Sequence, residues 1–157
     1  MKSYGHWIDG AWSQPAHWLY TQDPYQSQTW ARIARGTFQD ANDAVSVAKR
    51  AMTQGPWSKM PATDRGKVLR RIGDTLLENI EPLAACEVRD NGKLLAEVRG
   101  QLRYAAEVWY YFAGLADKVE GAVLPIEKSD MLGLTFHEPV GVVLALTAWN
   151  SPLNFFA

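Results

Sequence analysis

The most constraining feature of this sequence is an almost unbroken apolar run from Val140 to Trp149, with the letters VGVVLALTAW. Such a short run, rich in β-branched residues, favours a strand over a helix. A strand that is apolar on both faces must be covered on both sides, as in the centre of a parallel sheet with a helical layer on each face. The run therefore predicts an α/β fold with a buried strand over residues 140–149.

The residues after this run predict the start of a helix. Asn150 or Ser151 is a suitable N-cap, and Pro152 suits the first helical position. A helix that crosses over to a parallel neighbour needs about a dozen residues or more, whereas only residues 153–157 follow. One helical turn is not stable alone, and no upstream βαβ pattern supplies a neighbouring strand. We therefore expect the chain to stop inside a structural unit.

The N-terminal residues predict a hairpin and a strand. Asp9-Gly10 lies between the apolar residues of His6–Trp12, and this dipeptide is a strong turn signal because both residues tolerate positive φ. Residues 13–28 are polar and rich in turn-forming residues, among them Pro15 and Pro24. Thr29–Arg35 is a strand candidate that ends before Gly36.

Apolar residues at spacings of three and four predict four helices between residues 40 and 116. The first helix is capped by Asp40 and stops at Gly55-Pro56, and the second has its apolar face over Val68–Leu77. The third helix runs from Glu81-Pro82 to Asn91-Gly92, and the fourth spans Leu95–Ala116. The basic face of the second helix, Arg65 to Arg71, is interpreted as solvated. After Gly121 the pattern favours strands again, and Met131–His137 is a candidate.

Composition excludes several classes of function. The chain has 16 basic and 17 acidic residues and a formal net charge of -1, so it has no basic surplus to neutralise nucleic-acid phosphates. No apolar stretch is long enough to span a membrane, and the first residues do not form the apolar core of a signal peptide. The single cysteine has no intrachain disulfide partner. These observations predict a cytoplasmic protein.

Individual residues offer few other sites. The seven tryptophans include four in the first thirty residues, and without interleaved basic residues they favour cover for a core edge or a subunit contact over a stacking platform. Cys86 lies on the apolar face of the third helix, where we expect it to be buried and inert. His6, His17 and His137 have no metal-ligand spacing and are expected at the surface or at edges.

An ordered series of motifs resembles the aldehyde dehydrogenase superfamily. The strongest is Glu138–Val143 (EPVGVV) followed by Thr147–Pro152 (TAWNSP), which is similar to the strand and (P/A)WN-x-P turn of that family. Four more motifs lie upstream, in the same order as in the family and with compatible spacing. They are WIDGAW at 7–12, WSKMP at 57–61 with Arg65 and Leu69, DNGK at 90–93, and YFAG at 111–114. Two departures are Ala148, where many members have proline, and Leu94, where proline often follows DNGK.

The resemblance implies the N-terminal part of the aldehyde dehydrogenase fold: an incomplete Rossmann-like NAD-binding domain with packed N-terminal helices and a β-hairpin arm. Residues 1–122 would form the N-terminal part of the NAD(P)-binding domain. Residues 123–139 would form the arm that makes subunit contacts in a homo-oligomer. Residues 140–157 would form the first central parallel strand and the beginning of the next helix.

The resemblance also implies roles at the turn after the apolar run. Thr147, Ala148, Trp149 and Asn150 would line the nicotinamide-ribose end of an NAD or NADP site. The carboxamide of Asn150 would donate a hydrogen bond to the aldehyde oxygen as it becomes an oxyanion, because a rigidly held neutral donor stabilises developing charge without reorganising. The alternative interpretation is that Asn150 only caps the next helix.

The implied reaction is oxidation of an aldehyde to a carboxylic acid with NAD(P)+. It requires a cysteine nucleophile and a glutamate base, which in family members lie beyond the residues present here. We therefore predict no turnover by this chain alone. Two alternatives remain: a non-catalytic truncated product that associates with a full-length subunit, and an independent interaction module built on the tryptophan-rich N-terminus.

Overall fold

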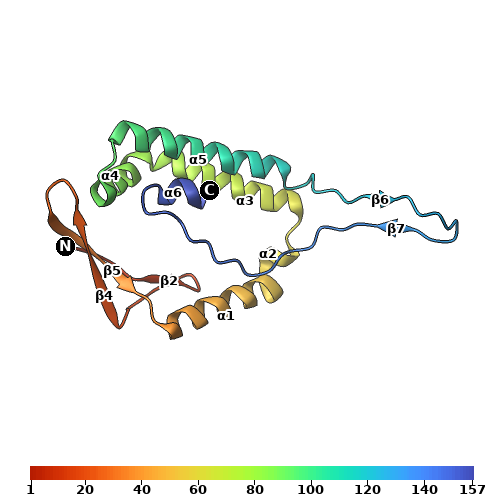
Figure 1. Ribbon diagram of the computed structural model, residues 1–157, viewed down its shortest axis with the longest axis horizontal. Coiled ribbons are helices and arrows are strands. Elements are labelled where there is room, and N and C mark those ends of the chain that lie inside the picture. Colours follow the sequence, from red (N-terminus) through yellow and green to blue (C-terminus); the bar gives the residue numbers. More distant parts are fainter.

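The computed structural model describes all 157 residues, and its largest unit is a layer of three helices. These are α3 (Ala62–Glu78), α4 (Ile80–Asn91) and α5 (Leu95–Leu115). Helix α5 lies along both α3 and α4 (Figure 1). The core cluster lies between α4 and α5 and consists of Ile80, Ala84, Val98 and Leu102. Gly92, with φ 77°, ends α4 in the left-handed conformation, as predicted from Asn91-Gly92.

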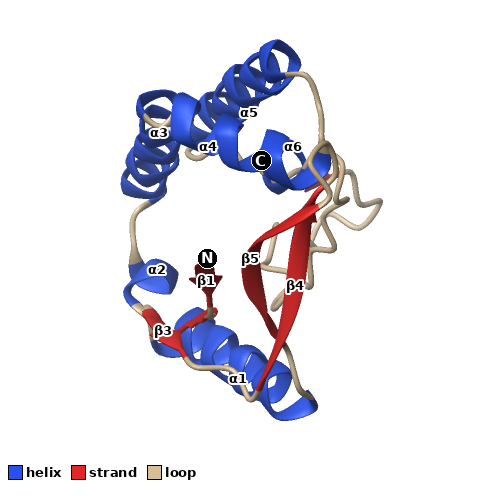
Figure 2. Ribbon diagram, turned by 90° about the vertical axis from the view of Figure 1, so that its left-hand side faces the viewer, coloured by secondary structure: helices blue, strands red, loops and turns tan.

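A three-stranded sheet lies on another side of the molecule (Figure 2). Its strands are β1 (Lys2–Tyr4), β4 (His17–Asp23) and β5 (Gln28–Arg35), in the order β1-β5-β4. Strand β5 pairs with β1 in parallel and with β4 in antiparallel register. The predicted strand at 29–35 is confirmed.

Residues 13–28, interpreted from the sequence as polar and turn-rich, contain the strand β4. Its first five residues, HWLYT, are mostly aromatic, aliphatic or β-branched, and such residues favour a strand that has a partner. The turn signal is real but shorter than predicted. The Asp23 carboxylate accepts hydrogen bonds from the Tyr25 and Gln26 amides, which closes the turn between β4 and β5.

The predicted N-terminal hairpin is confirmed as β2 (His6–Ile8) paired with β3 (Ala11–Ser13). Asp9 and Gly10 form its two-residue turn, with φ of 55° and 74°. Trp7 and Trp12 face each other across the strands with ring centroids 5.1 Å apart, and both are exposed. Of the four N-terminal tryptophans only Trp30 is buried.

Helix α1 (Phe38–Gln54) ends at Gly55, as predicted, and the short helix α2 (Pro56–Lys59) follows. The prediction that Asp40 is the N-cap of α1 was wrong by three residues. Thr37 is the N-cap, its side chain accepts from the Asp40 amide, and the Asp40 carboxylate accepts from the Thr37 amide. This reciprocal capping box needs Thr37 and Asp40 together, and Asp40 alone suggested the wrong boundary.

A hairpin of β6 (Val123–Leu124) and β7 (Gly133–Leu134) projects from the rest of the molecule (Figure 1). It lies within the predicted arm, residues 123–139, and its paired part is shorter than the strand predicted at 131–137. None of the helices combines the length and the hydropathy that a membrane-spanning segment requires.

The predicted buried strand over residues 140–149 is not formed. No strand of this chain pairs with the segment, and a strand requires a neighbour for its backbone hydrogen bonds. Its side chains are accordingly exposed, with Val140 at 96% and Leu146 at 87%. The predicted helix start is confirmed: α6 (Pro152–Phe156) has Ser151 as its N-cap and proline in its first turn.

Candidate functional site

The candidate site is built on the turn that leads into α6. The Ser151 amide donates to the Ala148 carbonyl at 3.2 Å and closes a turn with Trp149 and Asn150 at its centre. The Phe155 amide donates to the Ser151 carbonyl at 3.1 Å and begins the helix. Helix α6 lies against α5, and its Leu153 packs on the core cluster between α4 and α5.

Trp149 is anchored to the end of α4. Its indole Nε1 donates to the Asp90 carboxylate at 3.0 Å, while the other oxygen of that carboxylate accepts from the Thr21 hydroxyl. Asp90 thus joins β4, α4 and the turn, although 59 residues separate it from Trp149. Trp149 is still 63% exposed despite this bond.

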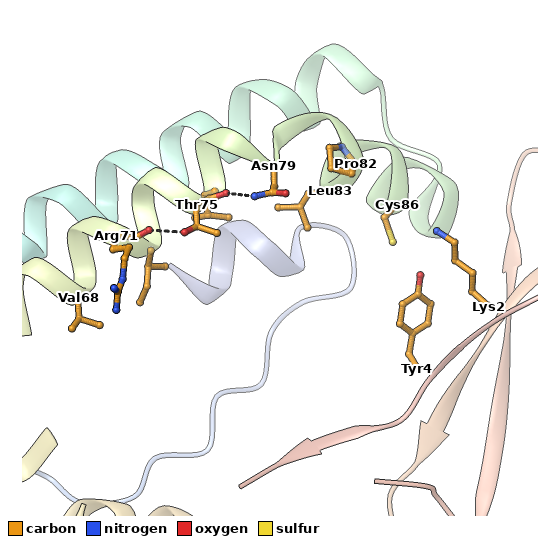
Figure 3. Close-up of a pocket in the computed structure, with 11 residues that line it drawn as sticks. Lys2, Tyr4, Val68, Arg71, Thr75, Asn79, Pro82, Leu83 and Cys86 are labelled. Carbon is orange, nitrogen blue, oxygen red and sulfur yellow. Dashed lines mark hydrogen bonds between the residues drawn. The ribbon is translucent and has the colours of Figure 1, made fainter. Parts of the chain in front are cut away.

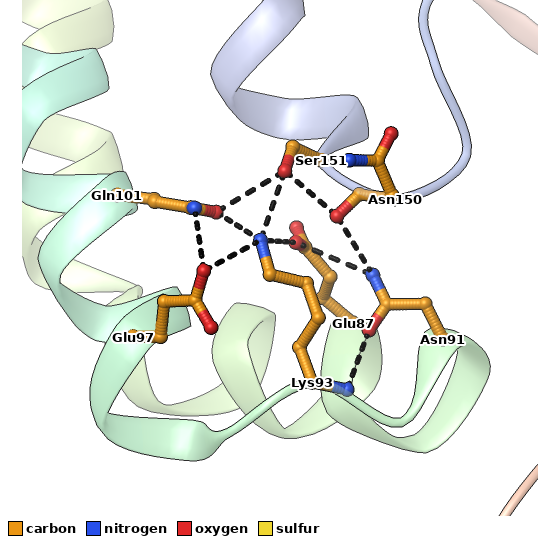
Figure 4. Close-up of polar contacts among 7 residues, drawn as sticks. All are labelled: Glu87, Asn91, Lys93, Glu97, Gln101, Asn150 and Ser151. Carbon is orange, nitrogen blue, oxygen red and sulfur yellow. Dashed lines mark hydrogen bonds and ion pairs between the residues drawn. The ribbon is translucent and has the colours of Figure 1, made fainter.

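Asn150 presents two polar groups to different surroundings. Its backbone carbonyl accepts from the Asn91 side chain at 3.4 Å and from the Ser151 hydroxyl at 2.7 Å (Figure 4). Its side-chain carboxamide has no hydrogen-bond partner, and the residue is exposed. Since Ser151 is the N-cap of α6, Asn150 does not cap that helix. The backbone is therefore held while the carboxamide stays available to a ligand.

The other two predicted cofactor residues make fewer contacts. Thr147 and Ala148 are both exposed, and the Thr147 hydroxyl makes no hydrogen bond within the chain. Trp149 and Asn150 therefore have hydrogen-bond partners on α4, at Asp90 and Asn91. Thr147 and Ala148 directly precede these two residues in the chain.

Beneath the turn lies a group of polar side chains that the sequence did not identify as part of a site (Figure 4). The Lys93 ammonium donates to the Ser151 hydroxyl at 2.8 Å and to the Gln101 side chain, and lies 3.8 Å from the Glu87 carboxylate and 3.9 Å from that of Glu97. Burial raises the pKa of Glu87, against the opposing effects of the Asn91 hydrogen bond and of the Lys93 charge. Of this group, Asn91 and Lys93 belong to the DNGK motif, which did not show what they contact.

Cys86 was expected to be buried, and that prediction was wrong: the residue is exposed. It faces outward because the opposite side of α4, at Ala84 and Glu87, is the side that packs against α5 and Lys93. Cys86 lines a cavity of about 770 Å³ between α3, α4 and β1, across from Tyr4 (Figure 3). Burial raises the pKa of the Tyr4 phenol, and the nearby Cys86 raises it further.

A second cavity of about 770 Å³ lies between α4, the β4–β5 sheet and the turn, and both Cys86 and Trp149 line it. His6 lies 3.7 Å from Asp40, and His17 and His137 are exposed. No group of three or more histidine, cysteine or acidic side chains is placed to hold a metal ion.

Comparison with known proteins decides the family. The model of the aldehyde dehydrogenase family matches residues 12–157. The chain belongs to the aldehyde dehydrogenase family. Among solved structures, a putative aldehyde dehydrogenase from Burkholderia cenocepacia is similar with a TM-score of 0.92 and 39% identity, over 97% of this chain and 32% of that one. The α/β fold and the resemblance seen in the motifs are thereby confirmed.

Relatives with named activities are similar over nearly the whole chain. A (Z)-2-((N-methylformamido)methylene)-5-hydroxybutyrolactone dehydrogenase from Acinetobacter baylyi is 37% identical over 98% of this chain and 31% of its own length. Betaine aldehyde dehydrogenase from Staphylococcus aureus, solved with NAD+, has a TM-score of 0.89 and 38% identity, over 95% of this chain and 30% of that one. The chain therefore spans about 30% of the length of these aldehyde dehydrogenases.

Proposed function

We propose that this chain supplies the N-terminal part of an NAD(P)-dependent aldehyde dehydrogenase unit, which oxidises an aldehyde to a carboxylic acid. Its specific contribution would be the oxyanion donor Asn150 and, with Thr147, Ala148 and Trp149, the wall of the nicotinamide-ribose site. The main support is the state of Asn150: its backbone carbonyl is hydrogen-bonded and its carboxamide is unpartnered and exposed. A donor held in this way stabilises developing negative charge.

We assign the turn to the nicotinamide end of a dinucleotide, and two observations support this assignment. An exposed indole and an unpartnered amide lie on one turn, and no glycine-rich phosphate loop occurs in the sequence. NAD or NADP would accept a hydride when bound. The role of this chain is to hold the indole and the amide in place beside that chemistry.

We predict that the 157-residue chain alone shows no turnover. Its only thiol, Cys86, lines the cavity opposite Tyr4 and has no histidine beside it in either cavity to act as a base. The test is the reduction of NAD+ to NADH, or of NADP+ to NADPH, with acetaldehyde or betaine aldehyde as the substrate. A rate that disappears in Cys86→Ser would overturn the prediction.

The function itself can be tested by complementation. The chain would be co-expressed with the part of the S. aureus betaine aldehyde dehydrogenase that lies beyond the matched 30%. We expect restored aldehyde oxidation, and Asn150→Ala should lower its kcat by about a hundred- to a thousandfold. Lys67→Met, at an exposed position on α3, is the matched control and should leave kcat unchanged. Restored activity that is insensitive to Asn150→Ala would contradict the proposal.

The remaining assignments concern domains and location. We propose that residues 1–122 and 140–157 belong to the NAD(P)-binding domain and that residues 123–139 are the arm of a homo-oligomer. The arm projects from the molecule and exposes apolar side chains, among them Leu132 at 73% and Phe136 at 77%. A cytoplasmic location stays a prediction from the sequence.

One observation favours a second candidate function, association with a full-length subunit without catalysis. The segment 140–149 exposes Val143 at 71% and Leu144 at 82%, and apolar side chains at this density are typical of a surface that packs against further polypeptide. Co-purification with a full-length homologue, without restored turnover in the complementation assay, would favour this candidate over the first.

A further inference from the structure

Ser151 has an unusual use for an N-cap residue. A serine at this position commonly accepts a hydrogen bond from a backbone amide of the first helical turn, but its side chain makes no such bond here. Its hydroxyl instead accepts from Lys93 Nζ at 2.8 Å, and it has two acceptors within hydrogen-bond distance, the Asn150 carbonyl at 2.7 Å and the Gln101 side-chain oxygen at 3.3 Å. The Asn150 carbonyl is the nearer of the two. Ser151 is 6% exposed, so its hydroxyl is largely shielded from solvent.

The partner of this hydroxyl is itself held on several sides. The Lys93 side chain is 15% exposed, donates to Gln101, and has the Glu87 and Glu97 carboxylates within 4 Å. The Glu87 side chain is 4% exposed, so its charge depends on the ammonium for compensation. Because its ammonium is restrained in this way, Lys93 can restrict the movement of the turn through its bond to Ser151.

A second bond reaches the same carbonyl from the same end of α4. The Asn91 side chain donates to the Asn150 carbonyl at 3.4 Å, and its oxygen accepts from the Lys93 amide at 3.0 Å. Asn91 and Lys93 flank Gly92, whose left-handed conformation turns the chain back so that both side chains reach the turn (Figure 4). The contacts converge on the Asn150 backbone, and none engages its carboxamide.

We propose that Lys93 is a positioning residue for Asn150: through the Ser151 hydroxyl it fixes the peptide from which the oxyanion-stabilising carboxamide projects. The inference rests on the proposed function, because a positioned carboxamide matters only if it meets a substrate. Lys93 itself does not touch the reacting atoms in this arrangement. It acts through Ser151, and the ion pair with Glu87 keeps the ammonium in place.

The anchoring can be measured without any ligand. Ser151→Ala removes the hydroxyl and leaves the Lys93–Glu87 pair intact. The double variant Lys93→Met/Glu87→Gln removes the ammonium without leaving a buried carboxylate unpaired, so it retains a route to the folded state. The control, Lys67→Met/Asp64→Asn, removes an exposed ion pair of 2.7 Å on α3.

The readouts are amide hydrogen exchange at Ser151 and Phe155 and the NMR signals of the Asn150 carboxamide, identified by their loss in Asn150→Ala. We expect exchange to rise roughly ten- to a hundredfold in Ser151→Ala and in the double variant, as for loss of a hydrogen bond to a charged group. The triple variant Ser151→Ala/Lys93→Met/Glu87→Gln should add little to this rise, because its substitutions remove the same bond. The Asn150 carboxamide signals should move in both, and the control should change exchange less than about twofold.

Two results would overturn the proposal: unchanged exchange and unchanged Asn150 signals in both variants, or an equal rise at Leu102, which would mean a general loss of stability. In the complemented enzyme, Lys93→Met/Glu87→Gln should lower kcat about tenfold or more and leave the KM for NAD+ nearly unchanged. If only the proposed function is wrong, turnover of the complemented enzyme will be insensitive to Asn150→Ala, while the hydrogen-exchange results without ligand will still be as expected.

Discussion

Thr37 and Asp40 show how much at the residue scale depends on one pair of side chains. The Asp40 carboxylate accepts bonds from both the hydroxyl and the amide of Thr37 at the start of α1. These hydrogen bonds, with a smaller contribution from nearby His6, hold the pKa of Asp40 below its usual value of 3.8. Protonation weakens these bonds, because a neutral carboxyl group is a poorer acceptor than a carboxylate. Because the pKa is lowered, the bonds contribute their full stability when the pH is above the usual pKa of the carboxyl group. This contribution is lost as the pH falls through the lowered pKa.

A pH series tests this capping box. Asp40→Asn should lower the free energy of unfolding at neutral pH, and the difference from the wild-type chain should shrink as pH falls below about 4 and through the lowered pKa, where Asp40 of the wild-type chain loses its charge. Urea unfolding followed by circular dichroism measures both. Asp43→Asn, which changes a carboxylate bonded only to Gln39, is the control. A difference that stays constant across the series would contradict the assignment.

At the scale of elements, the contact between α3 and α5 depends on small residues. A Cβ added to Gly66 would lie 2.8 Å from the Ala113 carbonyl oxygen and 3.3 Å from the Ala116 side chain. A backbone oxygen cannot move aside as the end of a flexible side chain can. The two helices therefore approach at Gly66 as closely as a residue without a side chain permits.

Two glycine-to-alanine variants separate this packing effect from helix propensity. Gly66→Ala should destabilise the chain by about 1–3 kcal/mol, because overpacking outweighs the gain in propensity. Gly100→Ala, in α5 with no atom within 4 Å of the added Cβ, should stabilise it by about 0.5–1 kcal/mol. Urea unfolding of the two variants gives the values. Equal and favourable effects at both positions would show that α3 and α5 are not in this contact.

At the scale of the whole molecule, the segment 140–149 is a long apolar stretch without a partner. Its side chains lie exposed beside folded helices, and the arm of β6 and β7 exposes further apolar residues. Exposed apolar surface of this kind promotes association. The folded helices and the exposed segment should therefore respond differently to substitution.

Charged substitutions in this segment test that separation. Leu144→Asp with Leu146→Asp should reduce self-association of the chain in sedimentation experiments, while the free energy of unfolding of the helices changes by less than about 0.5 kcal/mol, as for other exposed positions. Tyr25→Asp changes a side chain that is 92% exposed elsewhere and should leave association as it was. Equal effects of Tyr25→Asp and the double variant would mean that net charge, and not this segment, controls association.

The sequence by itself determined the features that depend on a few adjacent residues. The Asp9-Gly10 turn, the end of α4 at Gly92 and the start of α6 at Pro152 follow from local backbone preferences, and helical periodicity placed α3 and α5. The ordered motifs identified the family because their identity and spacing need no knowledge of contacts. Helix α1 began three residues earlier than predicted because capping required Thr37 and Asp40 together.

Only the tertiary structure decided what distant segments do to one another. Strand β4 formed because β5 supplied a partner, and residues 140–149 did not form a strand because no neighbour in the chain supplied one. The same holds at the site: Lys93 and Ser151 are 58 residues apart, and their contact depends on how α6 packs against α4 and α5. Hydrogen-bond pairing and burial belong to the packed assembly of elements, whereas periodicity and turn propensity belong to each stretch of sequence.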